Sequence, residues 1–122
     1  MKFSVVINCR NEADIIGKTL QSLDGLTDDC IVYDNGSTDN TAAIVRQHDV
    51  HYHQGSWEGF GPTKNKANTL AKYDWILSID ADESISDELK NELLCWNPEN
   101  ENIVYKLPFR NLLGNKILRH GD

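Results

Sequence analysis

Short apolar segments alternate along the chain with segments whose apolar residues recur at helical spacing. Three apolar segments have the length and composition of buried strands, namely residues 5–7, 30–33 and 74–79, and residues 50–53 predict a further short strand. Four other stretches carry apolar residues three or four positions apart and predict helices, around residues 15–23, 42–45, 63–71 and 89–96. This alternation predicts an α/β fold with a mainly parallel sheet flanked by helices.

The pattern changes after residues 97–99, where Pro98 interrupts a polar stretch. Segments 103–109 and 116–119 predict two further strands, joined by a turn at residues 113–115. The sequence contains no internal repeat, linker or low-complexity segment. We therefore expect residues 1–122 to belong to a single domain.

Three polar clusters follow the first, second and fourth predicted strands, at residues 8–12, 34–39 and 80–83. In an open α/β sheet, ligands bind at the carboxyl ends of the strands. Three independent clusters at that one edge are harder to explain as solvated surface than a single cluster would be. The pattern therefore predicts a ligand site at the carboxyl edge of the sheet.

The third of these clusters contains Asp80 and Asp82, directly after an apolar strand. Positions i and i+2 of an extended segment point to the same side, so both carboxylates can share one hard divalent cation. Two adjacent carboxylates repel each other unless a positive charge lies between them. Alternatively, they are solvated loop acids or helix caps, since residues 84–86 open the next helix.

The composition and net charge of the chain argue against some classes of binding partner. The chain has 122 residues, 39% hydrophobic and 25% charged, as in an ordinary globular domain. Its net charge of -7 argues against an electrostatic grip on nucleic acid or on an anionic bilayer. The three cysteines form no Cys-x-x-Cys pair and are expected to be reduced, partly buried thiols of a cytoplasmic protein. No apolar run is long enough to span a membrane, so any membrane association would be peripheral.

Four motifs, in this order and spacing, resemble the inverting family-2 glycosyltransferases, which have the nucleotide-sugar-binding GT-A fold. They are residues 4–12 (SVVINCRNE), 32–41 (VYDNGSTDNT), 64–67 (KNKA) and 80–83 (DADE). A narrower similarity, to bacterial enzymes that add a sugar to the lipopolysaccharide core, is carried by residues 57–65, 73–77, 110–111 and 119–121. The resemblance covers essentially the whole chain.

The resemblance implies a role for each matching residue. The nucleotide-sugar-binding positions would be Asn8, Arg10, Asn11, Glu12, Asp34, Asn35, Lys64 and Asp80. In particular, Asp34 and Asn35 would contact the base, Lys64 the ribose and phosphate, and Asp80 the ribose and the metal. Asp82 would coordinate Mg2+ or Mn2+ directly.

Two of these roles have plain alternatives. Asp34 and Asp39 can instead close an Asx turn and cap a helix. Lys64 can be a solvated lysine. However, a cation is disfavoured near a helix N-terminus, where we expect Lys64 to lie, unless an anion is nearby.

The resemblance also implies an activity. A glycosyltransferase of this kind takes a nucleotide-sugar donor, here expected to be a uridine diphosphate sugar, and transfers the sugar with inversion to a glycan or glycolipid acceptor. Lipopolysaccharide or cell-envelope biosynthesis would place it in the cytoplasm or peripherally at the inner membrane. The rival classes are a nucleotidyltransferase, which would need a glycine-rich phosphate loop after the first strand, and a binding domain without turnover.

The catalytic base of such an enzyme lies well downstream of the acidic pair, beyond Asp122. We therefore expect residues 1–122 to hold the donor site and to need a further C-terminal segment or a partner for the acceptor side. His51, His53 and His120 are candidates for a base by residue type, but lone histidines near strand ends are more often structural.

Two further features allow more than one interpretation. Trp57 and Phe60 can stack on a sugar or base, although we favour core aromatics that cover the sheet edge. Basic residues near the end can face an anionic glycolipid acceptor or merely alternate on a solvent-facing strand; they are Lys106, Arg110, Lys116 and Arg119.

Overall fold

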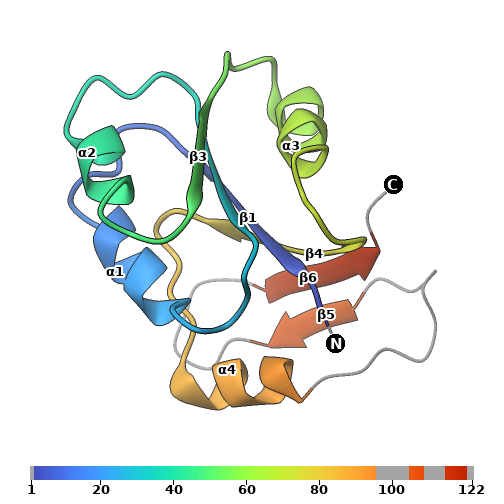
Figure 1. The fold of residues 1–122 in the computed structure, drawn as a ribbon. Helices are drawn as coiled ribbons and strands as arrows, with labels where there is room; N and C mark the ends of the chain where they lie inside the picture. The colour runs from blue at the N-terminus through green and yellow to red at the C-terminus, as the bar shows by residue number, and fades with distance from the viewer. Residues whose placement is uncertain (1, 96–104, 109–114, 121–122) are drawn as a thin grey trace.

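The computed structural model describes residues 2–95, 105–108 and 115–120. Within these residues a six-stranded sheet has the order β3-β2-β1-β4-β6-β5 (Figure 1). Its parallel part consists of β1 (Ser4–Cys9), β2 (Cys30–Asp34), β3 (His51–Gln54) and β4 (Trp75–Asp80). Two antiparallel strands, β5 (Tyr105–Pro108) and β6 (Asn115–His120), extend the sheet beyond β4. The predicted α/β fold with a mainly parallel sheet is confirmed.

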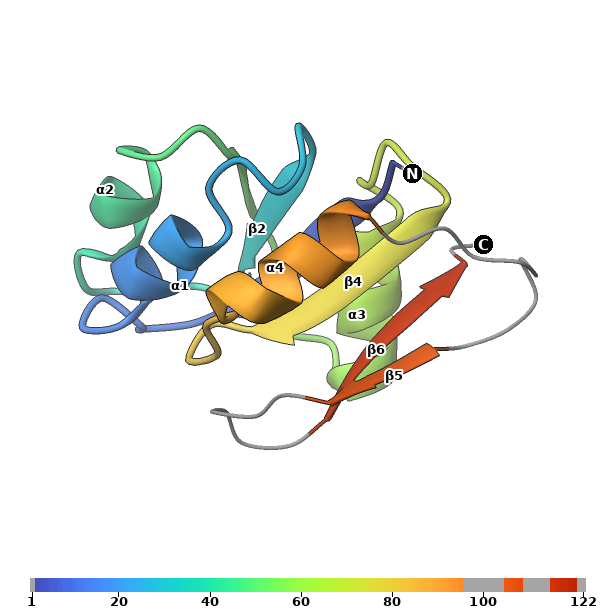
Figure 2. The same cartoon turned by 90° about the horizontal axis from the view of Figure 1, so that it is seen from below.

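Helices cover both faces of the parallel part. They are α1 (Ile16–Ser22), α2 (Thr41–Val45), α3 (Phe60–Asn68) and α4 (Asp87–Leu94). Figure 2 shows α1 and α4 on one face of the sheet and α3 on the other. No helix among the described residues is both long and apolar enough to cross a membrane.

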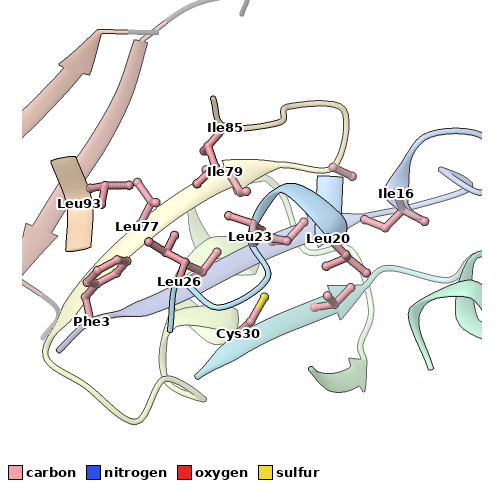
Figure 3. Close-up of a cluster of buried hydrophobic side chains, with 14 of the residues drawn as sticks. Phe3, Ile16, Leu20, Leu23, Leu26, Cys30, Leu77, Ile79, Ile85 and Leu93 are labelled. Atoms are coloured by element: carbon pink, nitrogen blue, oxygen red, sulfur yellow. The ribbon is translucent and has the colours of Figure 1, made fainter. Parts of the chain in front are cut away.

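The strand side chains divide between two apolar clusters, as the period of two requires. Val5 and Ile7 face the larger cluster, beneath α1 and α4, which Figure 3 shows. Val6 faces the smaller cluster, which includes Ala67 of α3. Because both faces of β1, β2 and β4 are covered, these three strands are mainly apolar, whereas the edge strand β3 is polar and largely exposed.

The element bounds differ from prediction mainly at α3. This helix begins at Phe60 and ends at Asn68, whereas residues 63–71 were the expected range. Gly59, with φ of 97°, takes a conformation that favours glycine and lets the helix begin directly after it. Leu94, expected in the buried stripe of the last helix, is 48% exposed. Trp96 and residues 113–114 of the expected turn lie outside the described part.

Topology places a crevice between β1 and β4. The chain leaves β1 toward β2 and β3 on one side, then returns to β4 on the other side. Such a switch point is where open α/β sheets bind ligands, beyond the carboxyl ends of the strands. In the register of these two strands, Asn8 lies opposite Asp80. The polar clusters after β1 and β4 therefore meet at one place.

Candidate functional site

A cavity of about 500 Å3 opens at the carboxyl edge of the sheet. Its walls come from residues that follow all four parallel strands: Asn8, Cys9, Arg10, Glu12, Asn35, Trp57, Phe60, Lys64, Asp80, Ala81 and Asp82. Seven of these were candidate site residues from the sequence. The volume is in the range of small-molecule and cofactor sites.

The acidic wall of the cavity is built at the end of β4. Carboxylate oxygens of Asp80, Asp82 and Glu83 lie within 4.8 Å of one another. A tight turn holds them, in which the Glu83 carboxylate accepts the N–H of Asp80 at 2.9 Å and the Asp80 carbonyl accepts the N–H of Glu83 at 3.0 Å. Three carboxylates form the oxygen-only donor set that Mg2+ and Mn2+ prefer, so these residues fit such a cation.

Glu83 was predicted to lie in this polar cluster but not to be a metal ligand. The Asp-x-Asp spacing singled out Asp80 and Asp82, which extended geometry places on one side. After β4 the backbone turns, and the alternation of an extended strand no longer applies to the next residue. The sequence did contain one indication of this role, because Glu83 directly follows Asp82.

Two amide side chains that line the cavity each have one buried atom without a hydrogen-bond partner among the described residues. The Asn8 Oδ1 and Asn35 Nδ2 atoms are buried and have no partner among the described residues. A buried polar group without a partner costs about 1–3 kcal/mol. Both residues line the cavity, so a polar ligand there would supply one hydrogen-bond donor and one acceptor.

Asp34 is completely buried and does not line the cavity. Its Oδ1 accepts the N–H groups of Gly36 at 3.0 Å and Ser37 at 2.8 Å, and its Oδ2 accepts the Tyr52 hydroxyl at 2.6 Å. The Asx turn expected as the alternative is therefore present. That Asp34 also contacts a base stays a prediction.

The loop after β1 is tied to the loop after β2. Asn11, with φ of 53°, donates its N–H to Ser37 Oγ at 2.8 Å and accepts the Thr38 N–H on Oδ1 at 2.7 Å. Glu12 donates its N–H to Thr41 Oγ1 at 3.0 Å. Asn11 is a candidate residue that does not line the cavity, and its contacts instead hold the first wall in place.

Asp39 holds the start of α2, as expected from its position. It accepts the Thr41 N–H at 2.9 Å and the Ala13 N–H at 3.3 Å. These bonds lower the pKa of Asp39, the Thr41 hydroxyl being the largest cause. Asp39 is not the N-cap residue, which is Asn40, but its carboxylate binds the first N–H of the helix from one residue further upstream.

Two basic side chains, Arg10 and Lys64, line the cavity. Lys64 lies in the middle of α3, because that helix begins at Phe60. The expectation that Lys64 sits near a helix N-terminus was therefore wrong, and the argument from the helix dipole does not apply. Its place in a cavity with a carboxylate cluster is what makes it a candidate for contact with an anionic ligand.

Burial and nearby negative charges raise the pKa values of two side chains that line the cavity. The pKa of Glu12 is raised by burial first and then by the negative charges of Asp82 and Asp39. Burial, followed by the charge of Asp34, raises the pKa of the Cys9 thiol to about 12. Cys9 is therefore a neutral thiol at physiological pH and is no candidate nucleophile.

We expect Glu12→Gln to raise the free energy of unfolding at pH 7 in the presence of a chelator, by less than about 1 kcal/mol. The folded-state pKa of Glu12 lies above its ordinary value, so the ionised side chain lowers stability as pH rises through that range. The difference between variant and parent should close near pH 4 or below, where Glu12 is protonated. Urea unfolding across pH measures it.

The matched control is Glu92→Gln, an exposed glutamate on α4 away from the cavity. It should show little change at either pH. A Glu12→Gln protein that is no more stable than the parent at pH 7 would show that the charges of Asp82 and Asp39 do not act on Glu12.

The expectation that Trp57 and Phe60 are core aromatics was wrong. Their side chains are 50% and 77% exposed and line the cavity. The core on that face is already filled by Tyr33, Ala67 and their neighbours, so the sheet does not need these two rings for cover.

His51 lies at the other edge of the sheet. Its Nε2 is 3.6 Å from the carboxylate of Asp29, the residue before β2. This position at the amino ends of the strands is remote from the cavity and supports the structural interpretation. The side chains of His120 and of the four basic residues near the end, Lys106, Arg110, Lys116 and Arg119, lie outside the described part.

Sequence comparison identifies close relatives. Residues 4–120 match the model of glycosyl transferase family 2. An uncharacterized glycosyltransferase of Rickettsia felis is 40% identical over 92 residues, which are 75% of this chain and 32% of the relative. LpsC of Rhizobium meliloti, a lipopolysaccharide core biosynthesis glycosyltransferase, is 34% identical over 107 residues, covering 81% of this chain and 39% of the relative. The chain thus spans about a third of the length of these relatives.

Solved structures of glycosyltransferases share the fold. S. aureus TarS 1-349 in complex with UDP-GlcNAc superimposes with a TM-score of 0.66 at 30% identity, covering 75% of this chain and 30% of TarS 1-349. Glucosyl-3-phosphoglycerate synthase from Mycobacterium tuberculosis, in complex with Mn2+, UDP and its glucosyl product, gives 0.59 at 26% identity, over 68% of this chain and 35% of that one. With nearly its whole length matched by the family model, this chain belongs to glycosyl transferase family 2 and has the GT-A fold.

Proposed function

We propose that this chain binds the nucleoside diphosphate part of a sugar donor in its carboxyl-edge cavity. The proposal rests on two groups of side chains that face the same cavity at the switch point between β1 and β4. A carboxylate cluster lies at the carboxyl end of β4, and two amides with buried atoms that lack partners among the described residues lie at the carboxyl ends of β1 and β2. A nucleoside diphosphate has a group for each: phosphates for a cation on the carboxylates, and a base for the amides.

Each cavity residue has a proposed role in this arrangement. Asp80 and Asp82, with Glu83 beside them, hold the divalent cation, Mg2+ or Mn2+. Arg10 and Lys64 supply positive charge for the phosphates, and Asn8 and Asn35 bind the base or ribose. Glu12 lines the nucleotide pocket, while Asn11 and Asp34 hold the loops that carry these residues. Nothing in this division requires Cys9 to react.

A divalent cation at the cluster would neutralise the negative charge that develops on the departing diphosphate. The side chains that line the cavity act on the donor according to their positions. They would hold the diphosphate at the end of β4 and so position the sugar for attack by an acceptor. The acceptor hydroxyl would lose its proton to a base beyond Asp122.

The complete reaction proposed is transfer of a sugar, with inversion, from a uridine diphosphate sugar to a glycan or glycolipid acceptor. UDP or UDP-GlcNAc in the related structures supports the choice of nucleotide. The similarity to LpsC supports an acceptor in lipopolysaccharide core biosynthesis. Both assignments come from longer proteins, and this chain spans about a third of the length of the curated relatives. We propose in addition that transfer takes place at the cytoplasmic side of the inner membrane.

Calorimetric titration tests this proposal. Uridine, guanosine, adenosine and cytidine diphosphates are titrated into the purified chain with Mn2+ and with a chelator. We expect uridine diphosphate to bind best, and only with Mn2+, because the carboxylate cluster without a bound cation would repel the diphosphate. Equal affinity in Mn2+ and in chelator would contradict the metal-dependent mode. No binding of any nucleotide would overturn the function.

A further inference from the structure

Trp57 and Phe60 form an exposed aromatic pair at the cavity. Their ring centroids are 5.0 Å apart and their planes are at 84°, an edge-to-face contact. Half or more of each side chain is nevertheless open to solvent. Two large aromatic rings exposed together beside a polar cavity are typical of a surface that binds something.

The loop that carries this pair is anchored at two points. Before Trp57, Gly55 packs so closely on the buried Tyr33 that a Cβ at Gly55 would lie 1.8 Å from the tyrosine hydroxyl oxygen. Between the two aromatic residues, the N–H of Glu58 donates to the buried Thr63 Oγ1 at 2.8 Å. The rings are therefore presented by a fixed backbone, which reduces the entropy lost when a ligand binds.

The position of the pair indicates which part of the ligand it meets. Trp57 follows β3, which pairs with β2, and Asn35 directly follows β2. The carboxylate cluster follows β4, on the other side of β1. A diphosphate held at the carboxylates would therefore extend its nucleoside across β1, toward Asn35 and the aromatic pair.

The chemistry of this end fits a nucleobase. Asn35 offers a buried, unpartnered amide N–H2 for the edge of a ring, and an indole offers a flat apolar face. A planar heterocycle with acceptors on its edge can satisfy both at once. Stacking of a base on an aromatic side chain contributes about 1–3 kcal/mol.

We propose that Trp57 stacks on the nucleobase of the donor, and that Phe60 holds the indole in place through the edge-to-face contact. This inference rests on the proposed function and adds a base-binding residue to it. Trp57 would then contribute to binding of the nucleoside but not to binding of the diphosphate. Comparing the binding of a nucleotide with that of a diphosphate alone therefore distinguishes base stacking by Trp57 from a general disturbance of the cavity.

The test compares UDP with inorganic pyrophosphate, both titrated in Mn2+ into the parent chain, Trp57→Ala and Trp57→Phe. We expect Trp57→Ala to weaken UDP binding about tenfold or more, and to change pyrophosphate binding less than twofold. Trp57→Phe should recover most of the UDP affinity, because it keeps an aromatic face. Leu70→Ala, which removes an exposed apolar side chain outside the cavity, is the matched control and should bind UDP normally.

Three results would overturn the inference. Unchanged UDP affinity in Trp57→Ala would show that the base does not meet the ring. Equal losses for UDP and pyrophosphate would show an effect on the diphosphate end. Unchanged UDP affinity with weaker binding of a UDP-sugar would assign the ring to the sugar. In each case UDP still binds the parent chain and the proposed function stands, whereas a parent chain that binds no UDP removes both.

Discussion

Asp82→Asn should lower metal-dependent binding of UDP by at least about a hundredfold, and Asp80→Asn should lower it less. Even residues that only orient a metal ligand change affinity by about 10–100-fold when they are replaced. Asp82 is exposed in the loop beyond β4 and lines the cavity, so its carboxylate can turn fully toward a cation. Asp80 is the last residue of β4, where the strand constrains it.

Calorimetry at several Mn2+ concentrations separates the loss of metal from the loss of nucleotide. Asp87→Asn is the matched control, because Asp87 is an exposed acid in the first turn of α4 and is not part of the cluster. It should bind Mn2+ and UDP as the parent does. Similar losses from Asp80→Asn and Asp82→Asn would show that the two carboxylates do not differ in role.

Asp34→Ala should lower the free energy of unfolding by about 3 kcal/mol or more. Asp34 is fully buried and accepts three hydrogen bonds, two from backbone N–H groups and one from Tyr52. Removing the carboxylate leaves these donors without their acceptor, at about 1–3 kcal/mol for each one that stays buried. Urea unfolding gives the difference directly.

The control for this change is Asp28→Ala. Asp28 also accepts bonds from side chains, those of Tyr73 and Lys72, but it lies at the surface, where such contacts contribute little. An Asp34→Ala protein as stable as Asp28→Ala would contradict the structural role. If Asp34→Ala keeps a cooperative fold but loses discrimination between uridine and guanosine diphosphates, Asp34 also belongs to the base site.

The parallel sheet and its ligand edge were predictable because burial on both faces leaves a strong pattern. Residues 5–7 and 75–79 are almost entirely apolar, and the polar clusters begin where these strands end. The short helix α3, which follows a loop with glycines, has a weaker pattern of apolar residues in the sequence. The start of α3 depends on the conformation of Gly59 and on the bond between Glu58 and Thr63, which apolar spacing does not report.

The site was predictable as a region but only partly as a set of contacts. Strand alternation fixes the direction of Asp34, the last residue of β2, but not that of Asn35, which follows the strand. Which of the two faces the cavity depends on where β2 ends, and the structure places Asn35 in the cavity and Asp34 in the turn beneath it. For Trp57 and Phe60, residue type alone could not distinguish core rings from exposed ones.

A crystal structure of this chain grown with UDP and Mn2+ tests the central claim most directly. The account predicts Mn2+, located by its anomalous scattering, on the carboxylates of Asp82 and Asp80. It also predicts the diphosphate at the switch point between β1 and β4, and the base beside Asn35 and Trp57. A nucleotide bound elsewhere, or one bound in the cavity with Mn2+ away from the carboxylates, would contradict the account.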